Sequence, residues 1–382
     1  MTAGFLSRVR EFAQAELLDK ERHFDSLPEQ PAAESALLHR AGLANWWIPA
    51  EYGGRGVSLA ESVDVVSELA YADGGFAFGS FLPVLGTVML QLYARDEVAR
   101  PILERLAADG GTLGVLGSEE AAGSELVRTS TTMHEREGEL VLDGSKYFST
   151  NTDPADTLLV LARAGDDFVM VAVPRATPGV EIIKRWDMIG VRGSGTYRTR
   201  LRNCTVPAGN RLSGNGLRAL EVGLNASRIL IAATAIGIAR RIRDVALDYA
   251  RSKPLKGATL ATNDVFAAKL GQIEMLIDVM RSQCHSAAAD FDQYLSAPDP
   301  AAALYRAGSL RSALAAKLFC GQAGWSIAST GSELFGGLGY THDHPIGKLV
   351  RDMRYVAIVE GGEDVMRDLL YSRYVVLPGK RR

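Results

Sequence analysis

The chain of 382 residues is too long for one simple hydrophobic core, so its length predicts two or three domains. An apolar content of 47% and a charged content of 23% are typical of an ordinary globular protein. The formal net charge of -3 argues against a nucleic-acid-binding protein, which would need a strongly basic face.

The N-terminal segment carries acidic, basic and apolar residues at helical spacing and has no apolar signal-peptide region. The longest apolar run, residues 229–239, is bounded by arginines and is too short to cross a bilayer. We therefore expect a cytoplasmic protein without a membrane segment. The three scattered cysteines show neither metal-ligand nor redox spacing, so they are expected to be isolated thiols.

Hydrophobic periodicity divides the chain into three domains of an α+β protein. Residues 1–110 show apolar side chains at helical spacing, which predicts an N-terminal α-helical domain. Residues 111–216 contain short alternating or β-branched runs separated by turn residues, which predicts a middle antiparallel β domain. Residues 217–382 return to long helical periods, which predicts a C-terminal four-helix bundle. Its helices are expected at residues 219–251, 265–294, 307–329 and 363–375.

Three loops in the middle domain carry residues suited to a ligand. Residues 117–125 follow an apolar strand and combine glycines with serines, so backbone N–H groups and hydroxyls can approach a ligand closely. Residues 146–151 place an aromatic side chain before Thr and Asn at a strand end, where it could stack on a flat cofactor. Residues 185–196 are rich in glycine and donors. The alternative for each is an ordinary turn or solvated loop.

Glu360 is the most interesting carboxylate, because it follows an apolar pair and precedes two glycines. An apolar pocket at this position would raise its pKa and make it a useful base. The alternative is an ordinary carboxylate at a helix N-terminus, where the helix dipole favours negative charge. Glu363 fits that alternative well. The pair His342 and His344 has no third ligand at a sensible spacing, so no metal site is expected.

Taken in order, these stretches resemble the acyl-CoA dehydrogenase family over essentially the whole chain. Residues 118–125 match the family's T-E-P-x-A-G-S-D loop, and residues 146–151 match its K-x-W/F-I-T-N strand end. The G-x-R-x-S-x-T loop is matched by Gly190, Arg192, Ser194 and Thr196, and the Y-E-G-T element by residues 359–362. Residues 336–339 match the GG-x-G element, and Arg351–Asp352 the R-D element.

The resemblance implies FAD as the cofactor and Glu360 as the base that removes the substrate's α-proton. It implies that Phe148 lies against the flavin ring, which Ser118 and Thr150 hydrogen-bond. The residues implied at the substrate are Ser124, Arg228, Val359 and Gly361. Those implied at the cofactor are Leu116, Ser118, Gly123, Ser124, Phe148, Ser149, Thr150, Lys253, Glu333, Gly336, Gly337 and Gly362.

The chain departs from the family pattern at positions that meet the phosphate and adenosine end of FAD. The departures are Glu120 for Pro, Lys253 for Arg, Asn263–Asp264 for a His/Phe-Gln pair, Glu333 for Gln and Gly362 for Thr. Lysine is a point charge and cannot reproduce the bidentate fork of arginine. The flavin-ring contacts are therefore better supported than the adenosine contacts.

The implied reaction is α,β-dehydrogenation of an acyl-CoA to the 2-enoyl thioester, with an electron-transfer flavoprotein or oxygen as electron acceptor. One alternative is dehydrogenation of an acyl or aminoacyl group on a carrier protein in natural-product biosynthesis. Others are a related flavin monooxygenase or oxidase, against which Glu360 argues, and a helical scaffold that has lost FAD. The resemblance also implies a homodimer or homotetramer, in which residues 253–257 and 333–337 complete a neighbouring subunit's FAD site.

Overall fold

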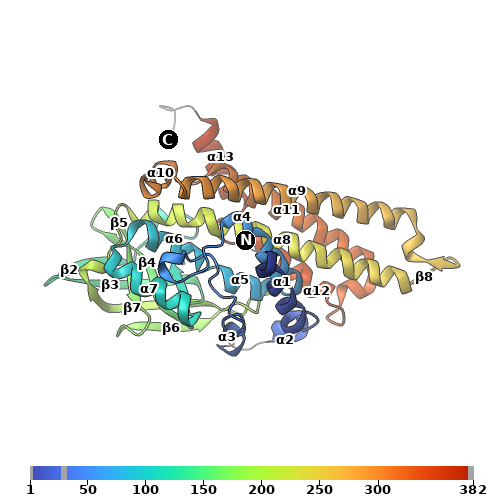
Figure 1. Ribbon diagram of the computed structural model, residues 1–382, viewed down its shortest axis with the longest axis horizontal. Helices are drawn as coiled ribbons and strands as arrows, with labels where there is room; N and C mark the ends of the chain where they lie inside the picture. The colour runs from blue at the N-terminus through green and yellow to red at the C-terminus, as the bar shows by residue number, and fades with distance from the viewer. Residues whose placement is uncertain (1–2, 27–31, 377–382) are drawn as a thin grey trace.

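The computed structural model describes residues 3–26 and 32–376, so the first two and last six residues of the expected terminal domains lie outside it. Helices come first, strands follow, and long helices close the chain (Figure 1). This order confirms the predicted α+β fold class, with helical domains on either side of a β domain.

In the N-terminal domain Phe76 packs against Phe12 and Phe24 of earlier helices, with ring centroids 6.1 and 5.9 Å away. Asp73 ends α4 and begins α5, and its carboxylate accepts a hydrogen bond from Phe76 N at 2.7 Å. An acceptor at this position satisfies a free N–H of the first helical turn, so Asp73 fixes where α5 starts. The helices are α1 (Ala3–Phe12), α2 (Glu21–Ser26), α3 (Ala32–Arg40), α4 (Leu59–Ala72), α5 (Gly74–Phe81), α6 (Val84–Tyr93) and α7 (Asp96–Asp109).

The middle domain is a seven-stranded sheet in the order β1-β4-β2-β3-β7-β6, with β5 paired to β4. The long pairs β3–β7 and β4–β5 are antiparallel, as expected, whereas β1 pairs with β4 in parallel. A parallel pair needs a crossover connection, which the chain between these two strands supplies. The strands are β1 (Thr112–Leu116), β2 (Thr132–Arg136), β3 (Glu139–Thr150), β4 (Ala155–Ala164), β5 (Asp167–Pro174), β6 (Val180–Arg185) and β7 (Thr196–Pro207).

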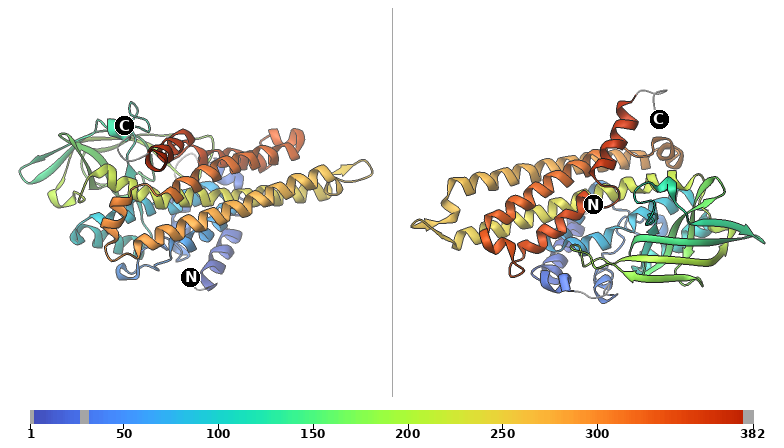
Figure 2. Two further views of the ribbon diagram at one scale, coloured as in Figure 1. Left: turned by 90° about the horizontal axis from the view of Figure 1, so that it is seen from above. Right: turned by 180° about the vertical axis from the view of Figure 1, so that it is seen from behind.

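In the C-terminal domain three long helices lie side by side (Figure 2). The helix expected at residues 307–329 is α11, which begins at Arg311 and ends at Leu334. A short helix that the sequence did not predict, Pro300–Ala307, precedes it and ends where Gly308 adopts φ +67. The last helix ends at Leu370, continues as a short π-helical turn to Val375 and projects from the bundle (Figure 1). The helices are α8 (Gly216–Ser252), α9 (Asp264–Leu295), α10 (Pro300–Ala307), α11 (Arg311–Leu334), α12 (Ile346–Arg354) and α13 (Glu363–Leu370).

The helix α8 is covered by α4, α9 and α11. At Gly237 the backbones of α8 and α4 meet so closely that a Cβ would lie 2.3 Å from Ser67 O. By length and composition, α8 and the stretch Gly74–Tyr93 could each cross a membrane, although the run 229–239 alone could not. The apolar window of α8 is 100% buried inside the protein, so core packing accounts for its composition.

The helices α9 and α11 also correct the expectation that all three cysteines are isolated. Cys284 and Cys320 are both buried, and their Sγ atoms lie 3.7 Å apart. Their separation of 36 residues hides this contact in the sequence. The remaining thiol, Cys204, lies in the core of the sheet.

Candidate functional site

Glu360 lies on a tight turn between α12 and α13. A 3₁₀ turn, Tyr355–Ala357, leads into it, and the backbone is left-handed at Glu360 (φ +55) and at Gly361 (φ +98). A left-handed non-glycine residue costs about 1–3 kcal/mol and persists only where its surroundings enforce it. A Cβ at Gly361 would lie 2.9 Å from Cε of Met366, so this position requires glycine. The turn must therefore be held by its neighbours.

Two buried cations hold the turn from opposite sides. Arg228 of α8 donates to Glu360 O from Nε at 3.2 Å and from Nη2 at 2.9 Å. Lys317 of α11 donates from Nζ to Val356 O at 3.1 Å and to Gly361 O at 2.9 Å. Only 4% of Arg228 and 1% of Lys317 are exposed. Of these two cations, only Arg228 was matched to the family pattern, whereas Lys317 lies in the apolar sequence of α11 without a motif around it.

The carboxylate of Glu360 is partly paired and strongly desolvated. Its Oε2 accepts a hydrogen bond from Oγ of Ser227 at 2.6 Å, and its Oε1 is buried without a partner. Burial raises the pKa of Glu360, while the Ser227 hydrogen bond and the charges of Arg228 and Lys317 oppose this rise. A buried carboxylate with one free oxygen is suited to act as a general base. Ser227 is a second contact that sequence reasoning missed.

The other carboxylates considered for this role are engaged in ion pairs. Glu363 accepts from Nη2 of Arg367 at 2.7 Å at the start of α13. Glu221 accepts from Nη1 of Arg218 at 2.5 Å and also pairs with Arg373. Neither carboxylate has a buried oxygen without a partner, such as the Oε1 of Glu360. The sequence treats Glu360 and Glu363 alike, and their partners separate them.

The residues expected at the flavin ring gather where β3 ends. Tyr147 N donates to Ser118 O at 2.9 Å, so the loop after β1 folds onto β3. The Oγ of Ser118 donates to Phe148 O at 3.4 Å. The hydroxyls of Thr150 and Thr196 share a hydrogen bond of 2.9 Å across β3 and β7. Ser118, Phe148 and Thr150, which the sequence grouped only by resemblance, are thus brought together.

An aromatic surface lies beside these hydroxyls. Phe148 is 49% exposed, and its ring centroid is 5.1 Å from that of Trp186. The Nε1 of Trp186 donates to Tyr147 O at 2.6 Å and fixes the indole. The Oγ of Ser149 is buried without a partner. An exposed aromatic face flanked by hydroxyls suits a flat cofactor ring such as a flavin.

A buried ion pair anchors the loop that carries Ser118. The Nζ of Lys146 donates to Oε1 of Glu119 at 2.8 Å and to Gly117 O at 3.1 Å, and 0% and 5% of the two side chains are exposed. Burial alone would raise the pKa of Glu119, but Lys146 and several hydroxyl and amide donors hold it well below its usual range. The lysine and glutamate that the sequence matched to two family motifs therefore join those motifs.

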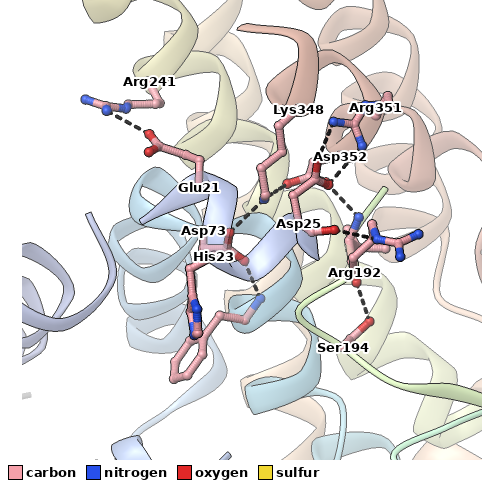
Figure 3. A network of polar contacts seen from close by, with 12 residues as sticks. Glu21, His23, Asp25, Asp73, Arg192, Ser194, Arg241, Lys348, Arg351 and Asp352 are labelled. Atoms are coloured by element: carbon pink, nitrogen blue, oxygen red, sulfur yellow. Dashed lines mark hydrogen bonds and ion pairs between the residues drawn. The ribbon is translucent and has the colours of Figure 1, made fainter. Parts of the chain in front are cut away.

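Two other matched elements contact each other through the network in Figure 3. Val191 N donates to Oδ1 of Asp352 at 2.7 Å, and Lys348 pairs with Asp352 and, at 2.7 Å, with Asp73. A Cβ at Gly190 would lie 2.4 Å from Arg351 O, so only glycine permits this approach. The network ties α5, α12 and the loop before β7 together.

The same loop is also fixed at its next residue, Arg192. The Nε of Arg192 donates to Asp25 O at 2.6 Å, and Arg351 pairs with the Asp25 carboxylate at 2.6 Å. The Oγ of Ser194 donates to Val191 O at 2.8 Å. The glycine, arginine and serine of this loop therefore hold three parts of the chain together.

Helix α8 contacts both the turn that carries Glu360 and the loop that carries Ser118. Gly117 approaches α8 so closely that a Cβ would lie 3.3 Å from Cδ2 of Leu220. Ser227, the partner of Glu360, follows Leu220 on α8 at a distance of about 10 Å along the axis, because a helix rises 1.5 Å per residue. The two parts of the candidate site are therefore connected through about two turns of α8.

The residues expected at the adenosine end form a separate group. The rings of Tyr249 and Phe335 lie 4.9 Å apart, and Nζ of Lys253 is 5.9 Å from the Tyr249 ring. This brings Lys253 beside the segment 333–337, next to the hairpin of β8 (Pro254–Leu255) and β9 (Ala258–Thr259) at the end of the bundle remote from the sheet (Figure 1). Lys253 is roughly 37 Å along α8 from Arg228, so the two cannot hold one ligand within a chain.

The remaining expected residues are distributed over these groups. Leu116 is buried in β1, whereas Gly123 and Ser124 are exposed on the loop that follows. Val359 and Gly362 lie on the base-bearing turn, so Gly362 is apart from the other adenosine-end residues. Glu333 pairs with Lys269 at 3.0 Å, and Gly336 and Gly337 follow α11.

Asn263, which replaces a residue that meets FAD in the family, and His344, at which no metal was expected, both have structural contacts. The Oδ1 of Asn263 accepts from Phe266 N at 3.1 Å and caps α9. The ring of His344 lies 4.4 Å from that of Phe335. Within residues 3–26 and 32–376, no group of three or more His, Cys, Asp or Glu side chains is arranged to hold a metal ion.

Comparison with known proteins identifies the family. Models of the N-terminal, middle and C-terminal domains of acyl-CoA dehydrogenases match residues 3–134, 114–204 and 214–375. The probable acyl-CoA dehydrogenase YngJ of Bacillus subtilis is 30% identical over 370 residues, which are 94% of each chain. An acyl-CoA dehydrogenase of the same organism is 28% identical over 379 residues, which are 96% of each chain.

Solved structures share the fold at lower identity. Butyryl-CoA dehydrogenase from Megasphaera elsdenii superposes with a TM-score of 0.88 at 23% identity, covering 96% of this chain and 97% of that one. An acyl-CoA dehydrogenase complexed with FAD from Bacillus anthracis gives 0.91 at 22% identity, covering 97% and 66%. The prolyl acyl carrier protein oxidase AnaB gives 0.86 at 22% identity, covering 98% of each. The chain thus belongs to the acyl-CoA dehydrogenase family, an enzyme class that oxidises CH–CH groups.

Proposed function

We propose that this protein dehydrogenates an acyl thioester between its α and β carbons, with Glu360 as the base and FAD as the cofactor. One observation carries the proposal: the Glu360 carboxylate has a buried Oε1 without a partner, on a strained turn held by Arg228 and Lys317. Family membership supplies the reaction class, and this carboxylate supplies the group that the class requires.

The α-proton of a saturated thioester is weakly acidic, so its removal needs a well-placed base with a raised pKa. The Ser227 hydroxyl occupies Oε2 of Glu360, which leaves Oε1 to accept the proton. Arg228 fixes the turn through the Glu360 carbonyl, so the carboxylate is oriented before the substrate arrives. Desolvation makes the ionised carboxylate more basic than one in water.

The surface at the end of β3 fits FAD. The exposed ring of Phe148 offers a flat face, and the hydroxyls of Ser118 and Thr150 lie close enough to bond the cofactor's edge. When bound, FAD supplies the acceptor for the hydride that leaves the β carbon. The related Bacillus anthracis structure is a complex with FAD, which supports this assignment. The contacts at Lys253 and residues 333–337 are proposed to come from a neighbouring subunit.

The test is anaerobic reduction of the purified flavoprotein by one acyl group presented on CoA, on pantetheine and on a carrier protein. We expect bleaching of the flavin and a 2-enoyl thioester as the product, identified by mass spectrometry. The carrier that bleaches fastest identifies the natural thioester. No bleaching with any acyl thioester would reject the proposed reaction, and a long-lived oxygen-adduct absorbance on reoxidation would favour a monooxygenase.

The bleaching rate should depend on pH through Glu360. Only the ionised carboxylate can take a proton, and burial raises its pKa above the ordinary value of 4.5. The rate is therefore expected to fall about tenfold per pH unit below that raised pKa. Stopped-flow measurements between pH 5 and 9 would locate the midpoint, and Ser227→Ala should move it upward by removing a hydrogen bond that lowers the pKa. A rate that is flat over this range would contradict the assignment.

Replacement of Phe148 should weaken cofactor binding. Phe148→Ala removes the exposed ring beside Trp186, so we expect roughly tenfold weaker FAD binding to the apoprotein, as for loss of an aromatic contact. Fluorescence titration with FAD measures the change. Phe168→Ala, on the distant strand β5, is the matched control and should leave the affinity unaltered. Equal losses in the two variants would argue against a flavin at Phe148.

A further inference from the structure

Lys317 is a buried cation with no carboxylate of the described residues at ion-pair distance. It is 1% exposed, and its Nζ donates to the carbonyls of Val356 and Gly361. Burial and the charge of Arg228 lower the pKa of Lys317 to about 8, against the opposing charges of Glu360 and Glu363. Burying a charged group without a counter-ion is costly, so a lysine placed here must have a compensating role.

The two carbonyls that Lys317 contacts bracket the residue that carries the base. Gly321 lies one turn further along α11 and faces the same turn, where a Cβ would come within 3.1 Å of Cα of Ala357. Glycine therefore lets α11 approach the turn, and the lysine one turn earlier reaches across to its carbonyls. Lys317 and Gly321 are four residues apart and lie on one face of α11, so this face meets the turn.

We propose that Lys317 is a positioning residue for the base: it holds the turn of residues 356–361 from the side of α11 and so fixes where the Glu360 carboxylate stands. Arg228 holds the same turn from α8. The turn is strained at Glu360, so it needs both supports to keep the carboxylate at one position. This role rests on the proposed function of Glu360.

The charges around Glu360 define what the loss of Lys317 would do. Glu360 faces Arg228 and Ser227 on α8, Lys317 on α11 and Tyr355 on the turn itself. Glu221, Arg373 and Glu363 lie behind these groups and face the two cations. Because Lys317 is one of only two cations acting directly on Glu360 among the described residues, its removal raises the pKa of Glu360 further.

The experiment compares Lys317→Met, Lys317→Gln and Gly321→Ala in the FAD-loaded protein. Lys317→Met should lower the bleaching rate at pH 7 at least tenfold and move the acidic midpoint upward by about one pH unit. Lys317→Gln also removes the charge, so it should move the midpoint by the same amount as Lys317→Met. It should keep more of the limiting rate at high pH, because the amide N–H group of glutamine can still donate to a carbonyl of the turn. Gly321→Ala keeps the charge, so it should lower the limiting rate without moving the midpoint.

The control is Lys20→Met, since Lys20 is exposed and donates to Glu16 O at 2.7 Å. It should change neither the midpoint nor the limiting rate. If the Lys317 variants lose thermal stability or FAD but keep the wild-type midpoint and limiting rate per bound flavin, Lys317 is merely structural and the proposal is overturned. If Lys317→Met does not fold, Lys317→Gln and Gly321→Ala decide by the same criteria.

A second readout separates this proposal from the proposed reaction. If the wild-type flavin is not bleached, the reaction fails, and the coupling of Lys317 to Glu360 is then measured by unfolding. The difference in the free energy of unfolding between the wild-type protein and Glu360→Gln should depend on pH. The midpoint of that dependence should move upward when Lys317→Gln is introduced into both proteins. A midpoint that is the same with and without Lys317 would overturn the role of its charge.

Discussion

Glu360→Gln is expected to keep the fold and the flavin but to lower the rate of flavin bleaching by an acyl thioester about 10²–10⁴-fold, the usual contribution of a general base. The amide has nearly the shape of the carboxylate and can still accept the hydrogen bond from Ser227. It cannot take a proton. The backbone contacts of Arg228 and Lys317 reach carbonyls and are unaffected by the change.

The measurement is single-turnover anaerobic reduction, with the flavin absorbance followed after mixing with the thioester. Glu363→Gln is the matched control, because Glu363 lies three residues away and is paired with Arg367. We expect it to bleach at nearly the wild-type rate. Rapid bleaching by Glu360→Gln, or a large loss in Glu363→Gln alone, would mean that the base is misassigned.

Lys348→Met should lower the free energy of unfolding by about 3–5 kcal/mol, the usual cost of leaving a buried charge without its partner. Lys348 is 4% exposed and pairs with the fully buried side chains of Asp73 and Asp352. Burial already raises the pKa of Asp352 against the opposing effect of Lys348. Without the lysine, two carboxylates share one desolvated site, so one of them must take up a proton or the site must open.

Chemical unfolding monitored by circular dichroism measures this loss, and the flavin content reports on the loop that the network fixes (Figure 3). The double variant Lys348→Met with Asp352→Asn should recover part of the stability, because one of the two unpaired charges is gone. The exposed Lys20→Met should cost little. A loss below about 1 kcal/mol in Lys348→Met would show that water reaches the carboxylates.

The sequence predicted much of the fold because periodicity is a local property. The helical and strand segments, and the order in which they follow one another, could be recognised from spacing alone. The short helix of residues 300–307 was missed, because eight residues are too few to show a clear helical period. The parallel pairing of β1 with β4 was missed because strand partners are set by tertiary packing.

The site was predictable only in part, for a related reason. The sequence offers Glu360 and Glu363 as near equivalents. Arg367, the partner of Glu363, lies only four residues away, whereas Ser227, the partner of Glu360, lies 133 residues away and could not be recognised from the sequence. Lys317 has no sequence signal that distinguishes a buried lysine from an exposed one. Its two carbonyl partners lie about 40 residues further along the chain. The residues that the resemblance places at the flavin ring, Ser118, Phe148 and Thr150, do lie near one another, but the sequence could not show which contacts are made within one chain.

The close contact of α8 with α4 has a consequence for folding. Segments about 170 residues apart in the chain must meet before α8 is covered, as the pair of Ser67 and Arg240 illustrates. Such long-range contacts slow folding, because the intervening chain must be ordered first. The two helical domains therefore cannot mature independently during synthesis. Until the C-terminal helices have emerged, the apolar face of α4 stays exposed to chaperones and to other nascent chains.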